Sequence, residues 1–485
     1  MIIRRISPGF LTVSCTNTEE ERQNQSIKKA HTLEVKCYTY QLFFKSLLYP
    51  VDYLNQKSMS LKRLTRIQLT ITLLAFLFVN LTLGQDLPVV KPEEVGFSGK
   101  RLERIDEAFT GYLKDNKMAG SVILVARKGK VAYYKAFGYK DLEAKSAMSK
   151  DAIFRIASQT KAIVSVGIMI LQEEGKLLIQ DPLSKYLPEF KETLVAQPKT
   201  DGGYEVVKAT RSITLRDLLT HTAGIGYGVG IAAEEWKKAG IQGWYFADRD
   251  EPIAETIKRM AALPMDAQPG AKWVYGYSTD ILGAVIERAS GMPLDQFLKD
   301  RIFAPLAMND TYFFLPKEKA ARLTKVYSPK EGQALVAAPV EGTMDSQGAY
   351  VEGPRKSFSG GAGILSTAKD YYLFLQMLAN RGELNGKRIL SRHTVDLMTS
   401  NHLTDELKDR KGEGFGLGFS VREDVGVQGT PGSVGEFGWG GAYGSTYWVD
   451  SSEELVVVYF TQLRPSSIVK DQLMLRTLVY QALEK

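Results

Sequence analysis

A serine and a lysine stand three positions apart at the start of a long apolar run, in residues 154–169, FRIASQTKAIVSVGIM. On a helix, positions three apart share a face, so the side chains of Ser158 and Lys161 would meet. Burying an ammonium group is costly unless it is paired or loses its proton. A lysine held beside a serine can accept the hydroxyl proton and make the serine a nucleophile. The alternative is a lysine whose stem lies along the surface while its head reaches water.

The Ser-x-x-Lys pattern alone does not identify a site, because the chain contains it four times: Ser26–Lys29, Ser158–Lys161, Ser366–Lys369 and Ser467–Lys470. The first lies in the leading segment. The last two stand at expected helix starts, where Ser and Thr are favoured as caps. Only Ser158 opens a long buried helix, so it is the candidate nucleophile, and a helix-cap role is its alternative.

Other hydrolytic chemistries find little support in the sequence. His221 stands in the stretch HTAG, but no Gly-x-Ser-x-Gly elbow is present for it to serve, so we expect it to be structural. Both cysteines, Cys15 and Cys37, lie in the leading segment. The remaining histidines of the main body, His393 and His402, form no His-Glu-x-x-His pattern. We therefore expect no metal and no cofactor.

The elements that must position Ser158 follow from the apolar patterning. Residues 120–141 and 445–463 each read as two strands around a turn, and a terminal helix is expected over 468–483. Between the hairpins, helical patterns cover 158–174, 252–263, 279–289 and 368–379. This order predicts an α/β fold in which an antiparallel sheet from 85–150 and 330–485 is flanked by helices, with a helical lobe inserted over 151–330. The cleft between lobe and sheet is the expected place for a site.

The leading segment predicts export. In residues 59–84, a charged start with Lys62, Arg63 and Arg66 precedes an apolar stretch of 15 residues and Gly84, the order of a secretory signal peptide. The alternative is a signal anchor that stays in the membrane. Residues 1–58 show no clear period, which favours a true start at Met59 and a mature domain over 85–485, periplasmic or secreted and without a stable membrane anchor.

The charge of the chain is concentrated in that leading segment. The net charge is +7, but residues 1–84 contain 11 Lys/Arg and 5 Asp/Glu, which leaves 51 against 50 in the rest. A nearly neutral body gives no support to a nucleic-acid partner.

Several stretches together resemble the serine β-lactamase and penicillin-binding-protein superfamily. In chain order they are FRIASQTKAIVSVGIM, SITLRDLLTHTAGIGYG, PGAKWVYGYSTDILGAVIERASG, RIFAPLAMNDTYF, SGGAGILSTAKDYYLFLQML and GWGGAYGSTYWVD. The resemblance runs from about residue 95 to the C-terminus and is strongest to the class C-like branch, especially the family VIII carboxylesterases. It implies a β-lactamase-like fold.

The resemblance also implies a set of catalytic residues. Ser158 would be the acylated nucleophile and Lys161 its proton acceptor. Tyr275, six residues after Pro269, would be the catalytic tyrosine, although the Asn of the family's Tyr-x-Asn motif is replaced by Tyr277. Tyr277 is expected to contact substrate, and it is the alternative for the catalytic role.

The third motif departs from the form seen in members that act on β-lactams. Those members usually carry Lys-Thr-Gly on the edge strand, whereas this chain has Trp439-Gly440-Gly441, the form that resembles the esterase branch. We expect all three residues to contact substrate. The resemblance places the oxyanion hole at the backbone N–H groups of Ser158 and Ala442.

These residues predict an exported serine hydrolase that acts on small carboxylic esters through an acyl-serine. Two alternatives remain open: a β-lactamase or D-Ala-D-Ala peptidase on the same machinery, and a non-catalytic acyl-binding or interaction protein of the same fold. In each case the partner is a small ester or β-lactam-like molecule.

Overall fold

The structure is a computed structural model that describes residues 87–328, 335–342, 344–466 and 469–484, all within one compact unit. The expected leader (1–58), the expected signal peptide (59–84) and Ser467 lie outside the described residues. Within the described ranges, no helix is both long enough and apolar enough to span a bilayer.

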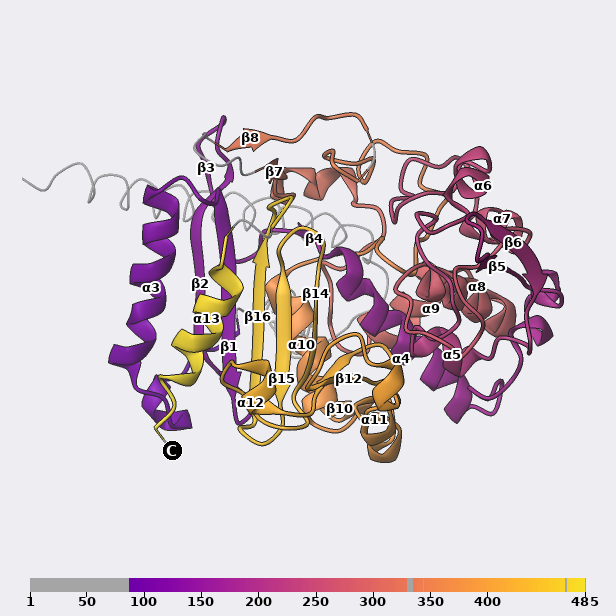
Figure 1. The fold of residues 1–485 in the computed structure, drawn as a ribbon. Helices are drawn as coiled ribbons and strands as arrows, with labels where there is room; N and C mark the ends of the chain where they lie inside the picture. Colours follow the sequence, from indigo (N-terminus) through magenta and orange to yellow (C-terminus); the bar gives the residue numbers. More distant parts are fainter. Residues whose placement is uncertain (1–86, 329–334, 343, 467–468, 485) are drawn as a thin grey trace, which may run out of the picture. The chain divides into compact units, whose positions relative to one another are not determined.

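The main sheet has eight antiparallel strands, drawn from both ends of the described chain (Figure 1). In order across the sheet they are β12 (Glu413–Phe415), β13 (Ser420–Arg422), β14 (Phe437–Gly440), β15 (Thr446–Asp450), β16 (Leu455–Thr461), β1 (Gly120–Arg127), β2 (Lys130–Asp141) and β3 (Ser146–Ala147). The pairing of β16 with β1 joins the C-terminal hairpin to the N-terminal one. This confirms the antiparallel sheet that the sequence predicts.

The two central strands are buried on both faces, which explains their unbroken apolar runs. In the register of β1 and β16, Ile123 is opposite Tyr459 and Leu124 is opposite Val458. Because side chains alternate along a strand, the first pair joins one hydrophobic cluster and the second pair joins another.

Helices lie on both faces of the sheet (Figure 1), and their side chains join both clusters. The helices α3 (Gly99–Lys114) and α13 (Asp471–Tyr480) pack together on one face, and α10 (Ala368–Ala379) packs against β16 and β1 on the other. The helix α4 (Thr160–Glu173) packs against α8 and α9 of a helical region made of α5 (Leu215–Leu219), α6 (Ala233–Lys238), α7 (Ile253–Met260), α8 (Ser278–Ser290) and α9 (Leu294–Leu298).

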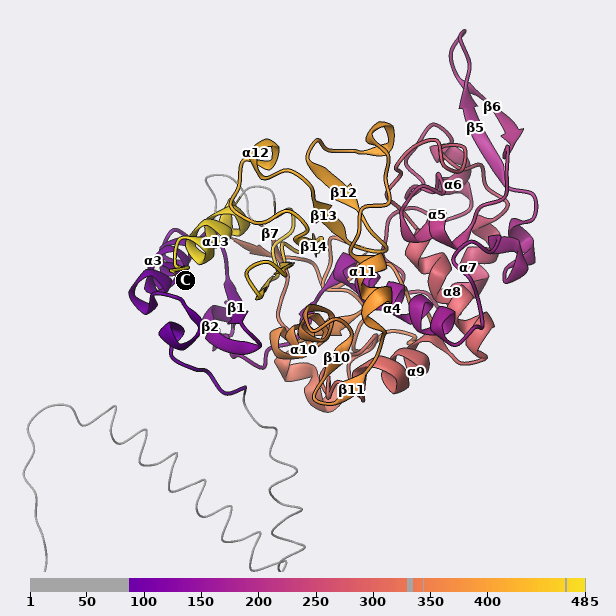
Figure 2. The same ribbon diagram turned by 90° about the horizontal axis from the view of Figure 1, so that it is seen from below.

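Short elements complete the unit. Four two-stranded pairs are β4 (Phe154–Arg155) with β9 (Leu365–Ser366), β5 (Leu194–Pro198) with β6 (Tyr204–Lys208), β7 (Tyr327–Ser328) with β8 (Val336–Ala337), and β10 (Glu383–Leu384) with β11 (Lys387–Arg388). Figure 2 shows the β5–β6 hairpin projecting beyond the helices. The remaining helices and turns are η2 (Pro92–Val95), η3 (Ala157–Gln159), η4 (Leu183–Lys185), η5 (Pro188–Phe190), the π turn η6 (Lys299–Phe303), η7 (Lys317–Arg322), α11 (Arg392–Met398), η8 (Asp405–Leu407) and α12 (Val425–Gln428).

Local chemistry sets the ends of the predicted elements. The turn between β1 and β2 is Lys128-Gly129, both with positive φ (53° and 70°), as a tight hairpin needs. The cap of α10 is Thr367, whose side chain accepts the Asp370 N–H, while Ser366 is hydrogen-bonded to Thr311 instead. The pattern at Ser366 is therefore part of a helix start.

Candidate active site

Ser158 lies in the 3-10 turn η3, which leads directly into α4. From Ala152 to Leu171 it is the one residue that is not buried. The preceding residue, Ala157, has φ of 45°, a region that residues with a side chain seldom adopt. The sharp turn presents the Ser158 hydroxyl from an otherwise buried segment.

Lys161 is buried, with 1% of its surface exposed, so its ammonium group does not reach water as the alternative interpretation would require. Its Nζ lies 2.9 Å from the carbonyl oxygen of Gly361, 3.1 Å from the hydroxyl of Tyr227 and 3.4 Å from Oγ of Ser158. Among the described residues it forms no ion pair with a carboxylate. Its nearest acceptors are therefore neutral, and one of them is the candidate nucleophile.

Tyr275 presents its ring to Lys161 and its hydroxyl to the sheet. The Lys161 Nζ lies over the ring, 4.6 Å from its centroid. The indole Nε1 of Trp439 donates a hydrogen bond of 3.0 Å to the Tyr275 hydroxyl. The ring of Trp273 stacks on Tyr275 at 5.7 Å and 15°. These contacts fix the tyrosine from the helical region and from β14 at once.

Tyr227 belongs to the site, and the sequence analysis did not single it out. It lies in the loop after α5, and its hydroxyl accepts a hydrogen bond from Lys161. Its ring meets Tyr275 edge-on at 5.7 Å. Burial, followed by the neighbouring Tyr275, raises the pKa of Tyr227 well above its ordinary value, so the phenol keeps its proton at neutral pH. The sequence offered one indication that Tyr227 belongs to the site: it lies among glycines, in GIGYG, as a residue of a loop does.

Tyr277 lies in the core. Its side chain is fully buried, its hydroxyl donates to the carbonyl oxygen of Gly243 at 2.6 Å, and its ring stacks on Trp236. This placement favours a packing role over the contact with substrate that the sequence suggested.

His221 packs behind the catalytic candidates. It is buried, its ring lies 4.8 Å from that of Tyr275, and Phe415 and Trp273 complete its surroundings. Burial, with a smaller effect of Lys161, lowers the pKa of His221 well below its ordinary value, so the imidazole is neutral. Its position supports the tyrosine ring, as the structural interpretation expects.

The stretch Trp439–Ala442 runs along the end of β14, which lies next to η3. A Cβ atom on Gly441 would lie 2.6 Å from the carbonyl oxygen of Ile156, so only glycine allows this approach to the segment before Ser158. Ala442 shares a small apolar cluster with Ala157. Its N–H has no hydrogen-bond acceptor among the described residues, as an oxyanion donor requires. Gly440 and Gly441 are both partly exposed.

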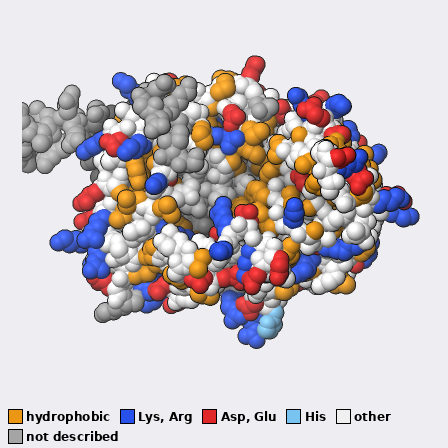
Figure 3. All heavy atoms as spheres, viewed as in Figure 1, with side chains coloured by type: hydrophobic (Ala, Val, Ile, Leu, Met, Phe, Trp, Pro, Cys, Tyr) orange, Lys and Arg blue, Asp and Glu red, His pale blue; other side chains and the backbone are white. Residues whose placement is uncertain are grey.

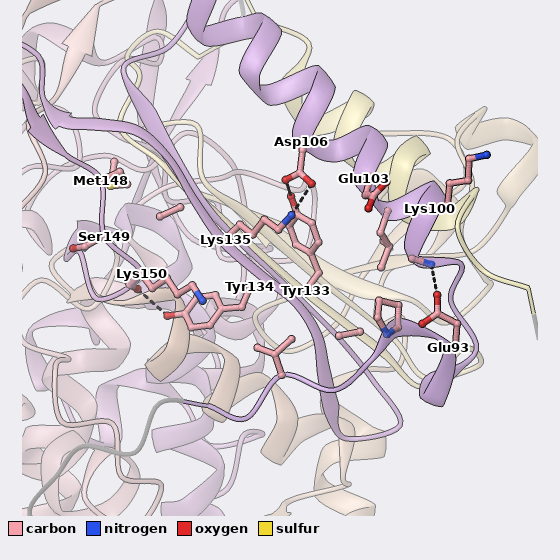
Figure 4. Close-up of a pocket in the computed structure, with 16 residues that line it drawn as sticks. Glu93, Lys100, Glu103, Asp106, Tyr133, Tyr134, Lys135, Met148, Ser149 and Lys150 are labelled. Atoms are coloured by element: carbon pink, nitrogen blue, oxygen red, sulfur yellow. Dashed lines mark hydrogen bonds and ion pairs between the residues drawn. The ribbon is translucent and has the colours of Figure 1, made fainter. Parts of the chain in front are cut away.

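Two further cavities lie away from Ser158. One, of about 840 Å³, is lined by α3, β2 and residues 148–150, and in it the Asp106 carboxylate accepts hydrogen bonds from Tyr133 and Lys135 (Figure 4). The other, of about 480 Å³, is lined by residues of α9 and the following segments. In the described part of the chain, no group of three His, Cys, Asp or Glu side chains could hold a metal ion.

The surface in Figure 3 carries Lys/Arg and Asp/Glu side chains scattered among one another, without a large patch of one sign. This matches the balanced charge of the main body.

Comparisons with known proteins agree with this fold. The Beta-lactamase family model matches residues 105–481. Esterase EstB of Burkholderia gladioli is 31% identical over 374 residues, which cover 74% of this chain and 89% of the esterase. A putative D-alanyl-D-alanine carboxypeptidase of Salmonella agona is 26% identical over 413 residues, 79% of this chain and 87% of the relative.

A solved structure shows the same architecture. EstCE1, described as a hydrolase with promiscuous acyltransferase activity, superposes with a TM-score of 0.68 at 27% identity, over 79% of this chain and 99% of its own. The resemblance of the motifs to the penicillin-binding superfamily and its esterase branch is thereby confirmed. The chain belongs to the beta-lactamase family, within the serine β-lactamase and penicillin-binding-protein superfamily.

Proposed function

We propose that this protein is a serine hydrolase that cleaves small, uncharged carboxylic esters through an acyl-Ser158 intermediate. Its family makes it a hydrolase of β-lactamase fold related to esterases and penicillin-binding proteins. The observation that carries the ester specificity is the hydrogen bond from Trp439 to Tyr275, made where β-lactam-processing members usually present a lysine.

Acylation begins when Ser158 Oγ attacks the ester carbonyl carbon. The hydroxyl proton passes to the Lys161–Tyr275 pair, which reacts in the form that carries one proton fewer than an ammonium and a phenol together; Lys161 Nζ is 3.4 Å from Oγ. The N–H groups of Ser158 and Ala442 hold the oxyanion, and losing one such donor typically costs roughly a hundredfold or more in rate. The C–O bond of the ester then breaks, and the alcohol leaves with the proton.

Deacylation reverses these roles. The same pair accepts a proton from a water molecule that attacks the acyl carbonyl, and returns it to Ser158 Oγ as the carboxylic acid leaves. The hydrogen bond from Trp439 and the nearby Lys161 prepare Tyr275 for this step, because both stabilise negative charge on its oxygen before that oxygen accepts the proton.

Trp439 also disfavours the binding of substrates that carry a carboxylate. A β-lactam brings a carboxylate into the site, and that anion would need a charge-assisted partner. The indole N–H is neutral and is already donated to Tyr275. An uncharged ester makes no such demand.

A parallel turnover assay tests this function with p-nitrophenyl acetate, p-nitrophenyl butyrate, nitrocefin and a D-Ala-D-Ala peptide, with Ser158→Ala as the matched control. We expect the two esters to be hydrolysed and nitrocefin to be slow. Faster turnover of nitrocefin than of p-nitrophenyl butyrate at equal concentration would establish the β-lactamase alternative. If the protein binds these four compounds but turns over none of them, the result would establish the alternative of a non-catalytic acyl-binding protein.

Export is part of the proposal and rests on the charged, apolar and small-residue order of residues 59–84. The mature protein should begin close to Gln85. N-terminal sequencing of the native protein from the periplasm or medium decides this, and a start within residues 1–58 would contradict it.

A further inference from the structure

Asp280 is a buried carboxylate close to the reacting groups, and the mechanism above assigns it no role. It is the third residue of α8 and is 1% exposed. Its Oδ1 accepts two hydrogen bonds, from the Ser359 hydroxyl at 2.6 Å and from the Gly361 N–H at 3.0 Å. Its Oδ2 has no hydrogen-bond partner among the described residues. Both hydrogen bonds come from the same short turn, Ser359–Gly361, so the buried carboxylate holds that turn in place.

The turn that Asp280 holds also contacts Lys161. Gly361 donates its N–H to Asp280 and accepts the Lys161 ammonium group on its carbonyl oxygen at 2.9 Å, the shortest of the three Lys161 contacts. The fit is close. A Cβ on Gly361 would lie 2.3 Å from Asp280 Oδ2, and a Cβ on Gly360 would lie 2.5 Å from the carbonyl oxygen of Thr279. The turn therefore rests directly on the start of α8.

We propose that Asp280 is a positioning residue for Lys161: it fixes the Ser359–Gly361 turn so that the Gly361 carbonyl holds the lysine beside Ser158. The kinetic consequence rests on the proposed function, whereas the placement of Lys161 does not. Without the carboxylate, the Ser359 hydroxyl and the Gly361 N–H lose a buried acceptor, and a buried donor without a partner drives rearrangement. Lys161 then loses the contact that restrains it most closely.

The chain offers a matched control in Asp370. It too is the third residue of its helix, α10, and is 3% exposed. Its Oδ2 accepts a backbone N–H from Asp310 at 2.7 Å and a hydroxyl from Thr311 at 3.0 Å. Its carboxylate makes the same kinds of contact as that of Asp280, but to a segment that does not contact Lys161.

The experiment compares crystal structures and fluorophosphonate labelling rates for the full mature chain and the variants Asp280→Ala, Asp280→Asn and Asp370→Ala. In Asp280→Ala, we expect the Lys161–Gly361 contact to be lost and labelling of Ser158 to slow by roughly tenfold or more. Asn keeps a carbonyl acceptor, so Asp280→Asn should restore the contact and recover most of the lost rate. Asp370→Ala should label like the parent. In ester turnover, Asp280→Ala should lower kcat and leave KM nearly unchanged.

Each result of this experiment either supports the positioning role of Asp280 or overturns it. Lys161 unmoved in the Asp280→Ala structure overturns the proposal, whatever substrate the enzyme uses. Equal slowing in Asp280→Ala and Asp370→Ala also overturns it, because general loss of stability then explains both. If Lys161 is displaced in the Asp280→Ala structure but Ser158 does not react even in the parent protein, the result supports the positioning role of Asp280. The same result refutes the proposed serine-hydrolase function. If Asp280→Ala does not fold, Ser359→Ala takes its place, and labelling at the parent rate in that variant counts against the proposal.

Discussion

Replacing Tyr227 with phenylalanine removes a hydroxyl that contacts Lys161 and also interacts with Tyr275, and it leaves the ring in place. The Lys161 Nζ donates to the Tyr227 hydroxyl at 3.1 Å, and this bond disappears in Tyr227→Phe. The ring contacts to Tyr275 at 5.7 Å and to Tyr277 at 5.0 Å do not involve the hydroxyl and are retained. The variant therefore tests the hydroxyl without emptying the space around it.

The size of the effect follows from the charge on Lys161. Hydrogen bonds to charged groups contribute roughly 1.5–3 kcal/mol, and about 1.4 kcal/mol corresponds to tenfold in rate. Lys161 is buried and keeps only the Gly361 carbonyl and the longer contact to Ser158. We expect acylation of Ser158 to slow by roughly ten- to a hundredfold.

Stopped-flow measurement of p-nitrophenol release during the first turnover reports this step. Tyr277→Phe is the matched control, because it removes a phenolic hydroxyl that donates to backbone carbonyls, to Gly243 at 2.6 Å and more weakly to Tyr227 at 3.4 Å. It should lower the free energy of unfolding by about 0.5–1.5 kcal/mol and leave acylation close to the parent rate. Parent-like acylation in Tyr227→Phe together with slow acylation in Tyr277→Phe would refute this assignment and return Tyr277 to the site.

Three further expectations concern the nucleophile, the substrate and the fold. Ser158→Ala should abolish fluorophosphonate labelling while Ser366→Ala, whose hydroxyl is buried against Thr311, labels normally; labelling that persists without Ser158 contradicts the mechanism. Trp439→Lys should raise nitrocefin acylation relative to ester turnover by roughly ten- to a hundredfold, and an unchanged ratio speaks against charge as the discriminating factor. Burial raises the pKa of Asp471 to about 6 from an ordinary 3.8, so its contribution to stability is full below pH 3.8 and is lost as pH rises through 6. Relative to Asp471→Asn, the parent should lose up to about 3 kcal/mol of unfolding free energy between pH 4 and 7, and a difference that is flat with pH in denaturant titrations contradicts this.

The sheet was predictable because its signals are local. The Lys128-Gly129 turn, the apolar runs of β1 and β16 and the helix start before α10 all follow from a few neighbouring residues. The helix expected over 252–263 is shorter, Ile253–Met260: Pro252 is its N-cap, and Ala261 is its C-cap.

The contact between Ser158 and Lys161 was predictable for a related reason. The two residues are three positions apart in one helical segment, so their side chains lie on the same face whatever the rest of the chain does. The distance of 3.4 Å between Lys161 Nζ and Ser158 Oγ agrees with that spacing. Tyr275 and Trp439 were identified as site residues separately, by resemblance, but the hydrogen bond between them joins positions 164 residues apart. No local pattern encodes it.

Tyr227 and Asp280 could not be recognised from the sequence, because their contacts depend on how loops distant in sequence pack together. The Tyr227 loop lies against the segment of Tyr275 so closely that a Cβ on Gly276 would be 2.2 Å from the carbonyl oxygen of Ile225. Asp280 acts on a turn that begins 79 residues later. Within its own segment, STDILG, it reads as an ordinary acidic residue in the first turn of a helix.

Trapping the acyl-enzyme tests whether Ser158 is the residue that carries the acyl group. The full mature protein is mixed with excess p-nitrophenyl butyrate, quenched in acid during the first turnover, and studied by intact mass spectrometry and peptide mapping. We expect one butyryl group per chain, on Ser158, formed at the rate of the p-nitrophenol burst and absent in Ser158→Ala. Continued ester turnover with no acyl group on Ser158, or with the acyl group on another residue, would contradict it.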